Sequence, residues 1–231
     1  MVATLAGRLR AARKRLLDRK RAPRARAPRV EAVFEHAAAV KECPEHLRLA
    51  PNTSTTLRGE LGKVLNHFNR ISGGSMFVAA ADLLGSTSVA TGGAGFADGF
   101  WNARSNPEAR LITVGGICED AISGLMSGLA SFGRHIGVGA SYGAFIAPLG
   151  HISARLHAIG NQARQPVSEG PYRPFFLVLA HAGLKTGEDG PTHADPQPLQ
   201  LLQDNFPLGT MITLTPWDPQ ELWPLVTEAL I

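Results

Sequence analysis

Apolar residues recur along this chain with two different periods, and segments of the two kinds alternate. Helical spacing predicts helices near residues 31–40, 56–71, 119–132, 143–160, 197–204 and 218–230. Between them lie continuous apolar or β-branched runs, typical of strands covered on both faces, at residues 76–80, 111–114, 136–139, 175–180 and 210–214. The alternation predicts an α/β fold with a doubly wound, mainly parallel sheet and helices on both faces.

The first 30 residues follow another pattern. Leucines stand among many arginines and lysines there, which permits an amphipathic helix containing Leu5, Leu9, Leu16 and Leu17. Pro23 and Pro28 then interrupt helical structure before Val30. We therefore predict a basic helical N-terminal extension before Val30.

Charge separates the same two parts. Residues 1–30 hold eleven of the 23 Lys and Arg residues and one acid, Asp18, which leaves 12 basic and 18 acidic residues for 31–231, a net charge of −6. The basic arm could contact nucleic acid or an anionic membrane, but no aromatic residue is interleaved for base stacking. The favoured interpretation is a solvated or partner-docking extension, and no nucleic-acid partner is expected.

Composition restricts the class further. With 231 residues, 44% of them hydrophobic, the chain can bury a substantial core. No apolar stretch approaches the roughly 18 residues that a membrane span needs, so no span is predicted. Only two cysteines occur, Cys43 and Cys118, which fits a reducing compartment and a cytoplasmic location and offers no structural metal site.

Sites in open parallel sheets lie beyond the carboxyl ends of the strands, so the loops there are the candidates for chemistry. The first predicted strand is followed by Asp82, a hydroxyl-rich turn and a glycine cluster at residues 91–95, which could cradle a phosphate or only form turns. Two acids, Glu119 and Asp120, open the predicted helix 119–132, as dipole compensation or as functional groups. Small residues in that helix indicate that another element packs against it: Ser123, Gly124, Ser127 and Gly128.

The loop after residue 180 combines histidines and acids. His181 stands at the predicted strand end, and His193 follows the turn that contains Glu188 and Asp189. This pattern favours a proton-transfer or oxyanion site. Metal ligation by the two histidines remains the alternative.

Three of these segments, residues 81–83, 116–121 and above all 187–193 (Gly-Glu-Asp-Gly-Pro-Thr-His), resemble successive signatures of the transketolase family. The resemblance covers about residues 55–231 and implies the pyrimidine-binding domain, the middle of three domains in the usual chain. It thereby leaves residues 1–54 as a basic N-terminal extension with linker helices. It therefore implies thiamine diphosphate as cofactor. Cys118 and Asp120 stand where the family usually has Arg and His.

The resemblance also implies roles for individual residues. Glu119 matches the glutamate that bonds a pyrimidine nitrogen and lets the cofactor activate itself, and Asp82 is a further cofactor contact. Residues 141–145 resemble the aromatic turn beside the pyrimidine, so that Tyr142 and Phe145 are expected to stack on it, whereas the family's tyrosine near Pro148 is missing.

Further roles follow from the resemblance for the substrate. Arg58 and Ser86 match phosphate contacts, Asp189 matches a contact to a sugar hydroxyl, and His181 matches a contact to a phosphate or hydroxyl. His193 matches a histidine near the donor carbonyl. The expected catalytic residues are Glu119, His181 and His193.

The sequence lacks the Gly-Asp-Gly and downstream Asn signature with which the family binds Mg²⁺ and the diphosphate, and it ends at Ile231. We therefore expect one subunit of a split transketolase of carbohydrate metabolism. It would transfer a two-carbon ketol unit between sugars or sugar phosphates. A separate diphosphate-binding subunit would hold most of the Mg²⁺ ligands, in a hetero-oligomer with two copies of each chain. The alternatives are a deoxyxylulose-phosphate synthase-like or oxo-acid dehydrogenase-like subunit and a noncatalytic scaffold.

Overall fold

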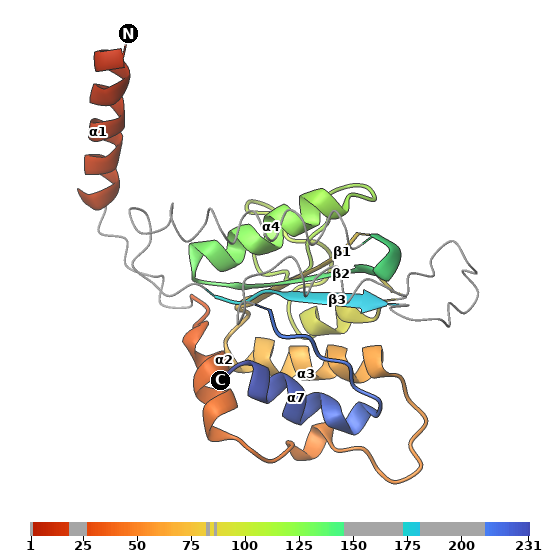
Figure 1. Cartoon of the computed structure of the whole chain (residues 1–231). Coiled ribbons are helices and arrows are strands. Elements are labelled where there is room, and N and C mark those ends of the chain that lie inside the picture. Colours follow the sequence, from red (N-terminus) through yellow and green to blue (C-terminus); the bar gives the residue numbers. More distant parts are fainter. Residues whose placement is uncertain (1, 19–26, 82–83, 86, 146–172, 181–210) are drawn as a thin grey trace.

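The computed structural model describes residues 2–18, 27–81, 84–85, 87–145, 173–180 and 211–231. In these ranges a parallel sheet of order β1-β2-β3 lies between helices on both faces (Figure 1). The strands are β1 (Met76–Ala80), β2 (Ile136–Tyr142) and β3 (Phe176–Ala180). The α/β fold predicted from the alternating pattern is confirmed.

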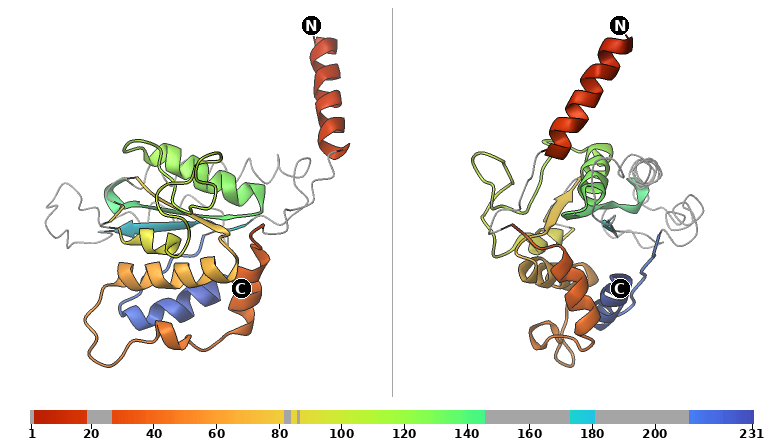
Figure 2. Two further views of the ribbon diagram at one scale, coloured as in Figure 1. Left: turned by 180° about the vertical axis from the view of Figure 1, so that it is seen from behind. Right: turned by 90° about the vertical axis from the view of Figure 1, so that its left-hand side faces the viewer.

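The helices form two layers around the sheet. One face is covered by α4 (Glu119–Phe132), and the other by α2 (Glu31–Ala39), α3 (Leu57–Ile71) and α7 (Leu222–Ala229). The predicted N-terminal helix is present as α1 (Val2–Asp18), which stands clear of these layers in the views of Figure 2. No helix in the described ranges combines the length and the apolar character needed to cross a bilayer.

Alternate side chains of each strand enter two different cores. Val78 and Val138 point toward Leu65, Phe68 and Trp223 in the larger core, whereas Ala79 packs with Ile122 and Met126 beneath α4. The larger core also contains three residues just before and within α2: Val30, Val33 and Ala37. They lie in the segment predicted as extension and linker helices, and the domain boundary at residue 55 stays a prediction.

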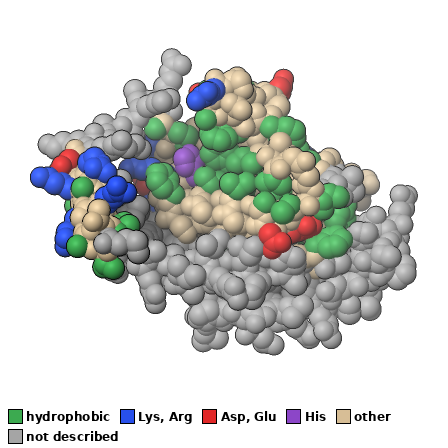
Figure 3. Space-filling view, turned by 90° about the horizontal axis from the view of Figure 1, so that it is seen from above, with side chains coloured by type: hydrophobic (Ala, Val, Ile, Leu, Met, Phe, Trp, Pro, Cys, Tyr) green, Lys and Arg blue, Asp and Glu red, His purple; other side chains and the backbone are tan. Residues whose placement is uncertain are grey.

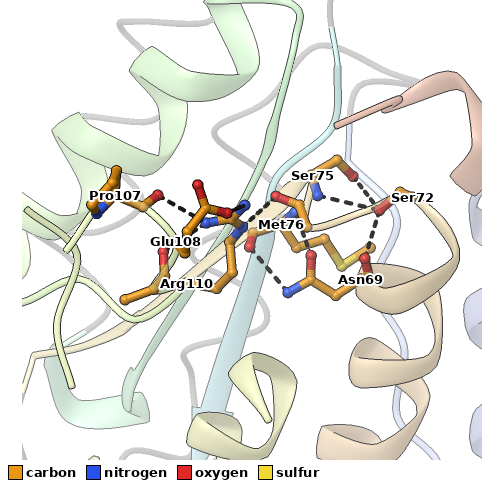
Figure 4. Close-up of polar contacts among 9 residues, drawn as sticks. Asn69, Ser72, Ser75, Met76, Pro107, Glu108 and Arg110 are labelled. Carbon is orange, nitrogen blue, oxygen red and sulfur yellow. Dashed lines mark hydrogen bonds and ion pairs between the residues drawn. The ribbon is translucent and has the colours of Figure 1, made fainter. Parts of the chain in front are cut away.

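The turn between α3 and β1 is held by a side-chain network (Figure 4). Asn69 donates from Nδ2 to the Gly92 carbonyl at 2.8 Å, and its Oδ1 accepts from the Met76 amide at 2.8 Å. The buried Arg110 guanidinium donates from Nε to the Gly74 carbonyl at 2.7 Å. These bonds satisfy buried backbone groups and set the start of β1 relative to α3.

Most of the predicted elements are found. The helices predicted at 31–40, 56–71 and 119–132 are α2, α3 and α4, and the one near 218–230 is the short helix η5 (Pro219–Glu221) followed by α7. Of the predicted helix 143–160 the described part is η3 (Gly143–Phe145), and the predicted helix 197–204 lies outside the described residues. Two further short helices are η1 (Glu45–Leu47) and η2 (Val89–Gly93).

Two predicted strands are wrong in their described parts. In 111–114 only Leu111 pairs, in isolated parallel bridges to Val78 and Phe100, and Gly115 follows the segment at φ 81°. Residues 211–214 form no strand, although Leu214 packs against the larger core. A short apolar run cannot by itself separate a strand from an extended segment that packs on a core.

Candidate active site

The three strands are parallel, so their carboxyl ends lie at one edge of the sheet, where α4 begins. Glu119 is the first residue of α4, and it follows Cys118, whose backbone is outside the helical region and whose side chain makes no cap. Glu119 is partly exposed, whereas Asp120 beside it is exposed. The fold therefore directs the first of the two acids toward the sheet edge.

A hydrogen bond fixes Glu119 against the sheet. Ser141, the residue before the last of β2, is buried and donates from Oγ to Oε1 of Glu119 at 3.0 Å. The bond joins residues 22 positions apart in the chain. A carboxylate can accept from more than one donor, so Glu119 can bind a ligand donor while it keeps Ser141.

Tyr142 and Phe145 occupy different environments. Ser141 points toward α4, and because successive strand residues alternate, Tyr142 points toward the α3 side, where it is 5% exposed. Phe145 lies beyond the strand end in η3 and is 39% exposed. Phe145 is thus the better placed of the two aromatic rings to meet a ligand at the edge of the sheet, and both roles stay predictions.

Arg58 is exposed near the beginning of α3. This end of α3 contacts the segment that follows β1, since Gly62 approaches the Ser88 carbonyl and the Thr91 side chain. Arg58 therefore lies at the same edge of the sheet as the carboxyl end of β1. Its phosphate-binding role stays a prediction. Five other residues lie outside the described ranges, and their different expected roles also stay predictions: Asp82, Ser86, His181, Asp189 and His193.

The small residues of α4, which indicated that another element packs against this helix, face two ways. Ser123 and Ser127 are buried within the domain, whereas a side chain at Gly124 or Gly128 would meet open space. The difference follows from helical geometry, because residues four apart share a face and adjacent residues do not.

An exposed apolar surface surrounds the two open glycines. Leu125 is 41% and Phe132 57% exposed on α4, and Ile117 is 68% exposed just before it. Figure 3 looks down on this side, where hydrophobic side chains gather. We call Ile117, Gly124, Leu125, Gly128 and Phe132 the outer face of α4.

Besides Glu119, a metal site or the cavity on the far side of the sheet would be alternative ligand sites in the described part. There, no group of three or more His, Cys, Asp or Glu residues is arranged to hold a metal ion. A cavity of about 240 Å³ lies on the opposite side of the sheet, lined among others by Cys43, Glu60 and Trp223, and Glu119 does not line it. The sheet edge at Glu119 is therefore the candidate site.

Ser141 is the residue of the candidate site that the sequence pattern missed. It stood in the segment 141–145, where only the aromatic residues were given roles. Its signal was a hydroxyl near the end of an otherwise apolar strand, and only the packing of α4 on β2 shows which group it meets.

The Glu119 carboxylate, at the first turn of a helix beside the carboxyl ends of parallel strands, lies where open α/β sheets usually place their ligand sites. Residues 51–231 match the family model of the transketolase pyrimidine-binding domain, and the chain belongs to this family of thiamine diphosphate-dependent enzymes. No curated protein sequence matches the chain.

The described residues fit one part of that cofactor. An aminopyrimidine presents ring nitrogens that can meet a carboxyl group and two flat faces that can meet an aromatic side chain. Glu119 supplies the carboxylate, and Phe145 supplies a partly exposed ring. The diphosphate would need cationic partners. Among the described residues at this edge, the exposed Arg58 is one cationic side chain.

Proposed function

We propose that this chain is the pyrimidine-binding subunit of a split transketolase, which transfers a two-carbon ketol unit between sugar or sugar phosphate substrates. The observation that carries the proposal is the Ser141 to Glu119 hydrogen bond, which holds the carboxylate at the sheet edge. The family match over residues 51–231 supplies the cofactor class. Residues 187–193, which resemble the transketolase signature most closely, favour this family over its thiamine-dependent relatives.

In this function Glu119 holds a proton at a pyrimidine nitrogen, and Ser141 keeps the Glu119 carboxylate in place. When bound, thiamine diphosphate supplies a nucleophilic carbon and accepts the negative charge that the broken carbon–carbon bond leaves behind. Phe145 covers one face of the pyrimidine, and Asp82 and Tyr142 complete its surroundings. These roles assign binding and orientation to this chain.

Substrate recognition falls to the remaining residues. Arg58 and Ser86 bind the substrate phosphate, and Asp189 binds a sugar hydroxyl. His181 and His193 stabilise charge or move a proton at the donor carbonyl and its neighbouring hydroxyls.

A second subunit completes the site. The outer face of α4 is apolar and contains open glycines, so another protein surface can closely approach the middle of the helix that begins with Glu119. That partner would bind Mg²⁺ and the diphosphate, in an assembly with two copies of each chain in the cytoplasm.

The test is ketol transfer by the full chain together with the subunit that co-purifies with it. Glu119→Gln keeps the size of the side chain but cannot hold the proton in the same way, so kcat is expected to fall about 100-fold or more. Asp120→Asn is the matched control, because Asp120 is the other acid of the same helical turn and is exposed. Its kcat is expected to stay within about threefold.

Donor choice separates the competing activities. Turnover of a ketose phosphate with an aldose acceptor supports the proposal, whereas turnover of a 2-oxo acid alone would reject transketolase activity. An assembled complex with no thiamine-dependent turnover would identify a noncatalytic scaffold. Full activity of Glu119→Gln would remove Glu119 from the catalytic role.

A further inference from the structure

The basic helix α1 lies outside the residues that match the family and takes no part in the proposed function. Every described side chain of α1 is exposed except that of Ala6, which is partly exposed. Figure 1 shows the helix standing clear of the sheet and its covering helices. The described apolar side chains of α1 therefore do not contribute to the core of the domain.

Apolar residues form a stripe along the first half of α1. Val2, Leu5 and Leu9 are spaced three and four residues apart, so they share one face of the helix. They are 79%, 59% and 62% exposed, and Leu17 further along is 64% exposed. Three or four large apolar side chains in water on one helix indicate a surface that docks.

Cationic residues flank this stripe on both sides. Helical geometry places Arg8 and Arg15 along one flank and Arg10 and Lys14 along the other. Arg13, four residues after Leu9, lies on the face of the stripe and ends it before Leu17. Asp18, at the last position, is the only acid of the helix. Long Arg and Lys side chains in such positions can extend their charged ends away from an apolar layer into which the stripe inserts.

We propose that α1 binds the surface of an anionic lipid bilayer, lying in the plane of the interface with Val2, Leu5 and Leu9 among the acyl chains. The lipid surface accounts for both halves of the pattern, because it offers negative headgroups to the flanks and hydrocarbon to the stripe. Nucleic acid would use the charges only and would leave the leucines in water. The inference concerns α1 alone and does not rest on the proposed function.

The experiment measures flotation of the full chain with vesicles of phosphatidylcholine alone or with about 30 mol% phosphatidylglycerol. Binding is expected on the anionic vesicles, at least about tenfold weaker on the neutral ones, and weaker again as salt rises from about 0.1 M to about 0.5 M.

A matched pair of variants tests the stripe. Leu9→Gln and Ala11→Gln place the same uncharged side chain on opposite faces of one helix, and neither changes the net charge. Leu9→Gln is expected to weaken vesicle binding about tenfold, because it removes one inserted side chain, and Ala11→Gln to stay within about twofold.

Three results would overturn the proposal. The first is no binding to either vesicle. The second is equal binding by the two variants together with tighter binding to a short DNA duplex, which would mean a contact through charge alone. The third is self-association of the chain without lipid that Leu9→Gln abolishes, which would identify a second copy as the occupant.

Discussion

The position of the Glu119 carboxylate depends on a single hydroxyl. Ser141 is 1% exposed and reaches Glu119 Oε1 from β2, so the bond is shielded from water on the side of the strand. A hydrogen bond to a charged group contributes about 1.5–3 kcal/mol, more than a neutral one. The loss of this bond should therefore be measurable in cofactor binding.

We predict that Ser141→Ala weakens thiamine diphosphate binding by the assembled complex about 10-fold or more, because the carboxylate is no longer held in place. Isothermal titration calorimetry gives the dissociation constant. Ser127→Ala is the control, since it removes an equally buried hydroxyl that donates to the Ser123 carbonyl of the same helix. An equal effect of the two variants would mean that any buried hydroxyl in this region matters only for stability.

Three histidines meet on the other side of the sheet. His67 of α3 contacts His46 through Nδ1 at 3.1 Å and His36 of α2 through Nε2 at 2.9 Å. Burial, followed by the neighbouring charges of His36 and His46, lowers the pKa of His67 from 6.5 to about 4. Its ring also packs against Phe68 and Trp223, which stack at 5.4 Å, so a charge at His67 would face the apolar core.

We predict that the free energy of unfolding decreases as the pH falls from 6.5 to about 4. The unfolded chain takes up a proton at His67 in this window and the folded chain does not, so stability rises with pH there. The loss should be about 1–2 kcal/mol, because solvent screens part of the interaction around a half-buried ring. Urea unfolding at a series of pH values measures it.

Another histidine supplies the control for this pH dependence. Burial, followed by Arg110 and Arg134, also lowers the pKa of His135, which lies elsewhere in the fold. Because the lowering of the pKa is larger at His67 than at His135, His67→Gln is expected to reduce the dependence on pH by more than His135→Gln does. The opposite order would place the origin of the pH dependence at His135.

At the scale of elements, α4 lies directly on β2 because two glycines leave room for it. A Cβ at Gly137 would lie 2.6 Å from the Met126 Cα and 2.8 Å from the Met126 carbonyl oxygen, both backbone atoms of α4. A Cβ at Gly139 would lie 3.3 Å from Ile122. The close approach is what brings Glu119 within reach of Ser141.

We predict that Gly137→Ala destabilises the chain by about 1–3 kcal/mol, because the helix must move away from the strand. Gly128→Ala is the control on α4 and should stabilise by about 0.5–1 kcal/mol, since its Cβ meets open space within a helix. Urea unfolding of both variants gives the two signs. Unchanged stability of Gly137→Ala would show that the two elements have room to separate at no cost.

At the scale of the whole molecule, the described residues bury apolar side chains in two cores, whereas Leu125 and Phe132 on the outer face of α4 are exposed. Leu125→Glu should weaken association with the co-purifying subunit about tenfold or more, because a charge would be buried in an apolar contact. The stability of the isolated chain should change by no more than about 0.5 kcal/mol, since Leu125 is already exposed. Surface plasmon resonance and urea unfolding measure the two effects.

Ile212→Glu serves as the control, since Ile212 is 65% exposed and is not part of α4. It should leave association unchanged. Full association of the Leu125→Glu variant would exclude the outer face of α4 as the docking surface.

The sequence by itself determined the class of fold, the elements with an unambiguous period and the family. Residues 76–80 and 119–132 coincide with β1 and α4, because continuous apolar runs and helical spacing are local properties of the chain. Glu119 was predicted as a cofactor-binding residue from the local resemblance of residues 116–121 to a family signature.

Only the tertiary structure decided which of these residues meet. In residues 111–114 only Leu111 forms β-bridges, and Ser141 hydrogen-bonds to Glu119. Gly124 and Gly128 face open space. His36, His46 and His67 come from three elements and contact one another through His67. Each of these results depends on contacts between segments distant in the chain. No local pattern encodes such contacts, because the periodicity of an element specifies the face that is buried and not the residues that cover it.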